Sequence, residues 1–87
     1  MSEVLVKFAE PVLSYDQTSY RAQACAGVMS GGLWEGWIEF IPIAPGGGVP
    51  LRSPRETTQP NRMDTLYWAT GLTSTYLEGA LLRALRK

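Results

Sequence analysis

An uninterrupted run of eleven residues, Leu33–Ile43, limits most strongly how this chain can fold. Apolar and polar side chains alternate along it with a period of two, which predicts a β-strand. One face consists of Trp34, Gly36, Ile38 and Phe40 and is typical of a core. The other consists of Leu33, Glu35, Trp37, Glu39 and Ile41, and its mixture of carboxylates with tryptophan is expected to meet water or a partner. Pro42 and the Ala44–Gly48 loop end the strand.

Two further strands are predicted upstream. Val4–Phe8 forms the first, which Pro11 stops. Ser19–Ala26 forms the second, and its alternation places Tyr20 and three alanines on one side. If this side shares a face with Trp34, the small alanines leave room for large neighbours.

Val49–Gln59 is predicted to be an edge strand or an extended, bulged segment, because Pro50 and Pro54 lack ladder donors. Pairing Ile43 with Val49 gives the simplest antiparallel register. That register would place Trp37 opposite Arg55, with Glu39 diagonal to it. A slip of one residue would reverse the faces.

The last third of the sequence predicts helices. Asn61, three residues before Asp64, is typical of a helix cap, so Arg62–Thr70 is expected to be a short helix, with a strand as the alternative. Thr75 and Glu78 match a capping box. A final helix follows with one apolar stripe, made of Leu77, Ala80, Leu81, Ala84 and Leu85. The expected fold is α+β, an antiparallel sheet of three or four strands with the C-terminal helix packed on one face.

Composition narrows the possible chemistry. The 87 residues predict a single domain over 1–87, and they include no histidine and one cysteine. Nucleophilic systems that need histidine are therefore excluded, and we expect no metal site and no cofactor. Cys25, between two alanines, is expected to be a small buried residue. No targeting signal or membrane-spanning run is visible, so we expect a cytoplasmic location and no membrane partner.

The formal net charge is zero, but the charges are unevenly placed. Residues 1–43 hold five acids and two bases, a net −3, and residues 44–87 hold three acids and six bases, a net +3. These halves could attract each other within the fold or between molecules, or leave a modest basic patch.

Residues 52–62 hold three arginines on a proline-stiffened backbone. Guanidinium groups bind phosphate or carboxylate in bidentate fashion, so this segment could contact a ligand or peptide. Alternatively, its arginines pair with Glu35, Glu39 or backbone carbonyls and hold a long loop in place. The candidate binding residues are Trp37, Glu39, Arg52, Arg55, Gln59 and Arg62.

Three functional hypotheses follow. The first is a non-enzymatic protein-interaction module that forms a homodimer or binds another protein, using the Leu33, Trp37 and Ile41 face and the arginine-rich edge. The second is a weak nucleic-acid-binding domain that uses the cations Arg52, Arg55, Arg62, Arg83, Arg86 and Lys87. The third is a small enzyme or ligand carrier using Arg55, Asp64 and Tyr67. We rank this hypothesis last because the sequence shows no pair of residues that could act as acid and base or as nucleophile and base.

The segments LWEGWIEF, RSPRETTQPNR, YWATGL and YLEGAL together resemble a family of small, uncharacterised bacterial proteins. The similarity covers Tyr20 to Leu85. It implies a bacterial cytoplasmic setting and brings no activity with it. The strand–helix layout is also loosely similar to double-stranded-RNA-binding-like domains, although no motif accompanies that similarity.

Overall fold

A computed structural model describes residues 2–43 and 48–86. Its strands are β1 (Ser2–Lys7), β2 (Val12–Leu13), β3 (Ser19–Val28), β4 (Trp34–Pro42), β5 (Leu51–Arg52) and β6 (Thr57–Gln59). A 3-10 turn, η1 (Ser30–Gly32), joins β3 to β4, and the helices are α1 (Arg62–Thr70) and α2 (Ser74–Leu85). The α+β class is confirmed. Of the predicted Ala44–Gly48 loop, residues 44–47 lie outside the described residues; Gly48 has a φ of 89°.

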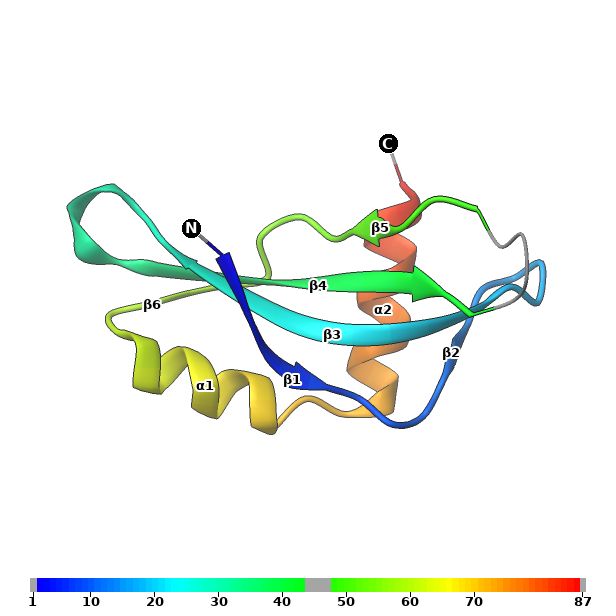
Figure 1. Cartoon of the computed structure of the whole chain (residues 1–87), viewed down its shortest axis with the longest axis horizontal. Helices are drawn as coiled ribbons and strands as arrows, with labels where there is room; N and C mark the ends of the chain where they lie inside the picture. The colour runs from blue at the N-terminus through cyan, green and yellow to red at the C-terminus, as the bar shows by residue number, and fades with distance from the viewer. Residues whose placement is uncertain (1, 44–47, 87) are drawn as a thin grey trace.

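All strand pairs are antiparallel, and the sheet is four positions wide. β1 and β2 both pair with β3, while β5 and β6 both pair with β4. The six strands therefore occupy four positions across the sheet, and the sequence predicted three or four strands. The long β3–β4 hairpin forms the centre, and its η1 end extends beyond the helices (Figure 1).

Small side chains on β3 face large ones on β4. Ala22 pairs with Phe40 and Ala24 with Ile38, and all four are fully buried. The alanines leave the space that the larger side chains fill, and Tyr20 adds an edge-on contact to the Phe40 ring, with ring centroids 6.3 Å apart. The alanines therefore do share a face with the large side chains of β4, which was the condition for them to leave room for such neighbours.

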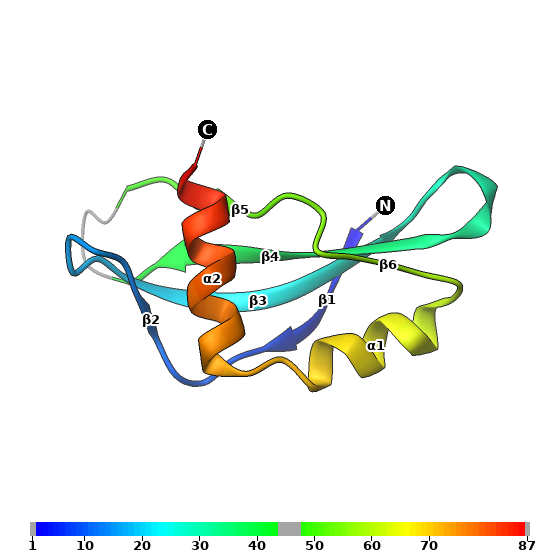
Figure 2. The same cartoon turned by 180° about the vertical axis from the view of Figure 1, so that it is seen from behind.

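Both helices pack on this same face, and α2 crosses β3 and β4 steeply (Figure 2). Four residues of the predicted α2 stripe are buried: Leu77, Ala80, Leu81 and Ala84. Leu85 is the exception, at 42% exposed. On α1, Trp68 packs so closely over β4 that a Cβ built on Gly36 would lie 2.6 Å from the Trp68 ring. Gly36 therefore sets how closely α1 approaches the sheet.

One predicted helix cap is confirmed and the other is wrong. The Asn61 side chain accepts a hydrogen bond of 2.8 Å from the Asp64 backbone N–H, so Arg62–Thr70 is a helix and not the alternative strand. The cap of α2 is Thr73, whose hydroxyl accepts from the Tyr76 N–H at 3.2 Å, and not Thr75. An earlier start lets Leu72 before the cap pack on the core with the helix, as a hydrophobic staple does.

The edge formed by β5 and β6 is bulged, as predicted, but the predicted register is wrong. Arg52, and not Arg55, lies on the same face of the sheet as Trp37. Arg52 pairs with Glu39, which is on that face, whereas Thr57 pairs with Gly36, which is on the other. The two pairings differ by two residues in register. The chain between them bulges at Ser53, whose hydroxyl accepts from the Ile38 N–H at 3.0 Å.

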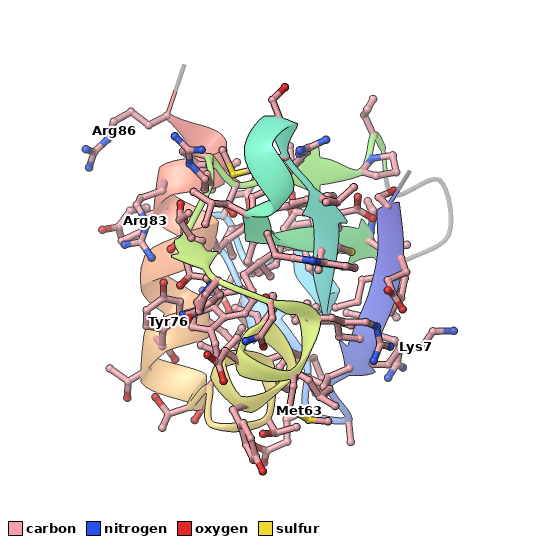
Figure 3. The ribbon with its side chains drawn as sticks, turned by 90° about the vertical axis from the view of Figure 1, so that its left-hand side faces the viewer. Lys7, Met63, Tyr76, Arg83 and Arg86 are labelled. Atoms are coloured by element: carbon pink, nitrogen blue, oxygen red, sulfur yellow. The ribbon has the colours of Figure 1, made fainter. Side chains whose placement is uncertain are left out.

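The bulge turns Glu56 toward α2, where its side chain is only 4% exposed. Tyr76 Oη donates to Glu56 Oε1 at 2.6 Å. Arg83 donates to both carboxylate oxygens, at 3.0 Å from Nε and 2.6 Å from Nη2. We call Glu56, Tyr76 and Arg83 the Glu56 triad. It fastens the irregular sheet edge to the C-terminal helix; Tyr76 and Arg83 lie along α2 in Figure 3.

Candidate functional site

The sheet face opposite the helices holds an organised cluster around Trp37. Arg52 lies on this face because its neighbour Leu51 turns into the core. The Arg52 guanidinium carbon sits 4.0 Å above the centre of the Trp37 ring, a cation–π contact. Trp37 is consequently only 3% exposed, so the predicted exposure of its side chain is wrong. The physical reason is that the long side chain of an edge residue covers its neighbour.

Glu39 is held in place beside this stack. Trp37 Nε1 donates to Glu39 Oε2 at 3.1 Å, and Gln23 Nε2 donates to Oε1 at 3.0 Å. Burial raises the pKa of Glu39, but the hydrogen bonds from Trp37 and Gln23 and the charge of Arg52 outweigh it and leave the pKa below its usual value. The carboxylate therefore stays ionised at neutral pH.

Cys25 lies under the same cluster and is 2% exposed, which confirms the expectation of a buried cysteine. Burial, followed by the negative charge of Glu39, raises the pKa of its thiol to about 12. A thiol in this state is neutral at physiological pH, so Cys25 does not offer a reactive thiolate.

The other three candidate residues are Arg55, Gln59 and Arg62, and each has a different environment. Arg55 is exposed on the same sheet edge, and its Nη1 lies 3.5 Å from the Met29 sulfur of the β3–β4 connection. Gln59 hydrogen-bonds to Thr57 at 2.7 Å, within β6. Arg62 forms a bidentate ion pair with Glu3 of β1, both contacts being 2.9 Å. The structure thus brings Trp37, Glu39 and Arg52 together and leaves Arg62 outside the cluster.

We call Gln23, Trp37, Glu39 and Arg52 the Trp37 cluster. Within residues 2–43 and 48–86, neither Arg52 nor Arg55 forms an ion pair with a carboxylate. A guanidinium above an aromatic ring still has N–H groups that can donate to other acceptors. The cluster therefore offers a fixed guanidinium on an open face, suited to a carboxylate or another planar acceptor.

Sequence reasoning missed Glu56. The three arginines of residues 52–62 were expected to pair with Glu35, Glu39 or the backbone, whereas Arg62 pairs with Glu3 and Glu56 pairs with Arg83. Glu56 is the one acid among those arginines, which is the signal that could have identified it. Burial opposes its ionisation, but the hydrogen bonds from Arg83 and Tyr76 prevail and keep the pKa of Glu56 below its ordinary value.

The cations of the nucleic-acid hypothesis do not all share one surface. Arg62 and Arg83 are in ion pairs, and Lys87 lies outside the described residues. A hollow of about 360 Å³ beside the end of α2 is lined by Arg52, Arg83 and Arg86. Figure 3 shows Arg86 extending away from the body of the protein rather than over it.

The residues of the enzyme hypothesis are also placed by the structure. Asp64 lies in the first turn of α1, and Tyr67 is 70% exposed on the same helix. Arg55 is on the sheet edge, where its Nη1 contacts the Met29 sulfur. In the described ranges, no group of three or more Cys, Asp and Glu side chains is arranged to hold a metal ion.

None of the helices described is long and apolar enough to cross a membrane. No protein-family model, no curated protein and no solved structure matches the chain.

Proposed function

We propose that this protein is a non-enzymatic protein-interaction module of the bacterial cytoplasm, and that its open sheet face binds a carboxylate-bearing segment of another protein. The observation that carries the proposal is the Arg52 guanidinium carbon 4.0 Å above the centre of the Trp37 ring, on a face of the sheet that neither α1 nor α2 covers (Figure 2). Arginine is among the residue types most enriched at binding hot spots, and the buried Trp37 ring supports Arg52 from below.

Preorganisation supports the same proposal. The Arg52 side chain is exposed, yet its contact with Trp37 restricts its rotamers before a partner arrives. Less side-chain entropy is then lost on binding than for a freely moving arginine. Arg55, on the same edge, adds a second exposed guanidinium for a neighbouring acidic group.

The test is a titration of the ¹⁵N-labelled protein with an acetylated peptide that contains four glutamates, followed by NMR. The expected result is a set of shift changes centred on Trp37, including its indole N–H, and Gln23. The same peptide with glutamine in place of glutamate should cause no change. A single charge-assisted hydrogen bond contributes about 1.5–3 kcal/mol, so Arg52→Gln should weaken binding about tenfold or more.

Arg62→Gln is the matched control, because Arg62 is an exposed arginine that the structure places outside the Trp37 cluster. Equal losses in the two variants would indicate general electrostatic attraction and would refute a local site. A titration with a short single-stranded RNA at 50 and 200 mM salt tests the second hypothesis, that the protein binds nucleic acid. Binding of RNA that falls steeply with salt, with no response to the peptide, would establish the protein as a nucleic-acid binder instead.

A further inference from the structure

The register of the sheet aligns four side chains in one row across the face opposite the helices. Lys7 of β1 pairs with Gln23 of β3, and Gln23 pairs with Glu39 of β4. Glu39 pairs in turn with Arg52 of β5. Because paired residues lie on the same face of an antiparallel sheet, all four side chains belong to the open face, which is turned toward the viewer in Figure 1. We call Lys7, Gln23, Glu39 and Arg52 the cross-sheet row.

A β-bulge places Lys7 on this face. The register of β1 shifts between Val4 and Val6, so Leu5 is an extra residue in the strand. Side chains alternate between the two faces along a strand, and one extra residue therefore reverses the face that the following side chains take. Lys7 consequently extends away from both helices, as Figure 3 shows.

The cross-sheet row has a cation at each end. Lys7 and Arg52 are exposed, and in the part of the chain that the structure describes neither forms an ion pair. Glu39, inside the row, is only partly exposed and already accepts hydrogen bonds from two neighbouring side chains. Arg21 is also exposed and lies two residues before Gln23 on the same face, so it adds a second cation near Lys7. The open face therefore presents positive charge toward both edges of the sheet.

The spacing of these cations determines which ligand fits. Neighbouring strands lie about 4.8 Å apart, so the backbones of Lys7 and Arg52, three strand spacings apart, are separated by about 14 Å. An extended peptide advances about 3.4 Å per residue, so its side chains at positions i and i+4 are also about 14 Å apart and point to the same side. An acid at position i+2 would lie about 7 Å from Arg52, close to the carboxylate of Glu39, where like charges repel.

We infer that the partner's segment crosses the sheet in extended form along the cross-sheet row, with one carboxylate on Arg52 and a second, four residues away, on Lys7 and Arg21. The inference rests on the proposed function, because this is the carboxylate-bearing segment that Arg52 binds. Glu39 selects against an acid at the middle position, so the residues between the two acids are neutral. Trp37 is 3% exposed under Arg52, and its ring is not free for a nucleic-acid base to stack on, which favours an acidic peptide.

The test compares the affinity of the whole chain for two short peptides by NMR titration at low salt, about 50 mM. Both peptides are acetylated and amidated and contain two glutamates among serines and glycines. The glutamates are four residues apart in the first peptide and two apart in the second. Wild-type protein should bind the first about fivefold more tightly, which corresponds to the contribution of about 1 kcal/mol from one exposed ion pair. The double variant Lys7→Gln, Arg21→Gln should reduce this ratio to about one, whereas Arg52→Gln should weaken the binding of both peptides.

Arg86→Gln is the control, because Arg86 is an exposed arginine that extends away from the body of the protein at the end of α2 (Figure 3). This variant should keep the fivefold ratio, and circular dichroism should show every variant folded. Equal binding of the two peptides with Arg52 still required, or an unchanged ratio in the double variant, would overturn the crossing path and leave the proposed function standing. A ratio lost in Arg86→Gln would indicate general electrostatic attraction and would overturn the path as well. If no acidic peptide binds, both the path and the proposed function are wrong.

Discussion

Replacing Glu56 by glutamine tests whether the Glu56 triad holds the bulged sheet edge on α2. The substitution keeps the shape of the side chain, removes its charge and turns an amide donor toward the donors of Arg83. Breaking a buried ion pair costs about 3–5 kcal/mol. Here the Arg83 side chain is 41% exposed and can be rehydrated, so we expect a loss of about 2–3 kcal/mol in the free energy of unfolding.

For a domain of this size, each kcal/mol lowers Tm by about 4–8 °C, so Glu56→Gln should melt about 10–20 °C below the wild type at pH 7. Glu10→Gln makes the same change at an exposed acid without an ion pair among the described residues and should alter stability by less than about 0.5 kcal/mol. Arg83→Gln should cost less in the Glu56→Gln background than alone, because the two residues share one interaction.

The effect should depend on pH in one direction. The folded state lowers the pKa of Glu56 below its ordinary value of 4.5. Stabilisation by the carboxylate is therefore complete above about pH 4.5 and disappears as the pH falls through the folded-state pKa. Urea unfolding at pH 7 and pH 3 should show the gap between wild type and Glu56→Gln closing at the lower pH. A loss under 1 kcal/mol at pH 7, or a gap that is constant with pH, would refute the reasoning.

Three other predictions follow from single contacts. Gly36→Ala should destabilise by about 1–3 kcal/mol in urea unfolding because its Cβ meets the Trp68 ring. Gly79→Ala should cost less, because the helix propensity of alanine contributes about 0.5–1 kcal/mol and its Cβ, 3.3 Å from Arg83 Nη1, requires only a small shift of that guanidinium within the Glu56 triad. Equal effects of the two substitutions would contradict the close packing at Gly36. Cys25, buried with its pKa raised to about 12, should react with Ellman's reagent at pH 8 only when the chain unfolds, and fast labelling of native protein would count against its burial. Asn61→Ala should lower the free energy of unfolding, obtained from thermal melting, by about 1 kcal/mol because the α1 cap is lost, whereas Asn61→Asp keeps a capping oxygen and should retain most of that stability.

The sequence was most informative where a pattern is local. The alternation of Leu33–Ile43 and the spacing of Asn61 and Asp64 depend on a few neighbouring residues, and the strand and helix they predict are present. The small size of Ala22 and Ala24 similarly anticipated which face of β3 meets the core. Each of these inferences follows from backbone geometry that the residues themselves determine.

The sequence was least informative where one residue of register decides the outcome. The bulge at Ser53 shifts the pairing between β5 and β6, so Arg52 and not Arg55 meets the Trp37 face. The same bulge turns Glu56 toward Arg83, twenty-seven positions away in the chain. A bulge depends on side chains from several elements at once, and hydrophobic periodicity does not record it.

The β3–β4 hairpin also has a consequence for how the chain folds. The separation of its nine paired positions grows from 6 residues at Val28 and Trp34 to 22 at Tyr20 and Pro42, and the Met29 N–H donates to the Leu33 carbonyl at 2.6 Å to close the connection. By contrast, the Arg62–Glu3 pair that links α1 to β1 spans fifty-nine positions. Loop-closure entropy is smaller for the hairpin, so it is the element that can form first and template the rest. The folding rate would then be set by how fast both ends of the chain find this hairpin.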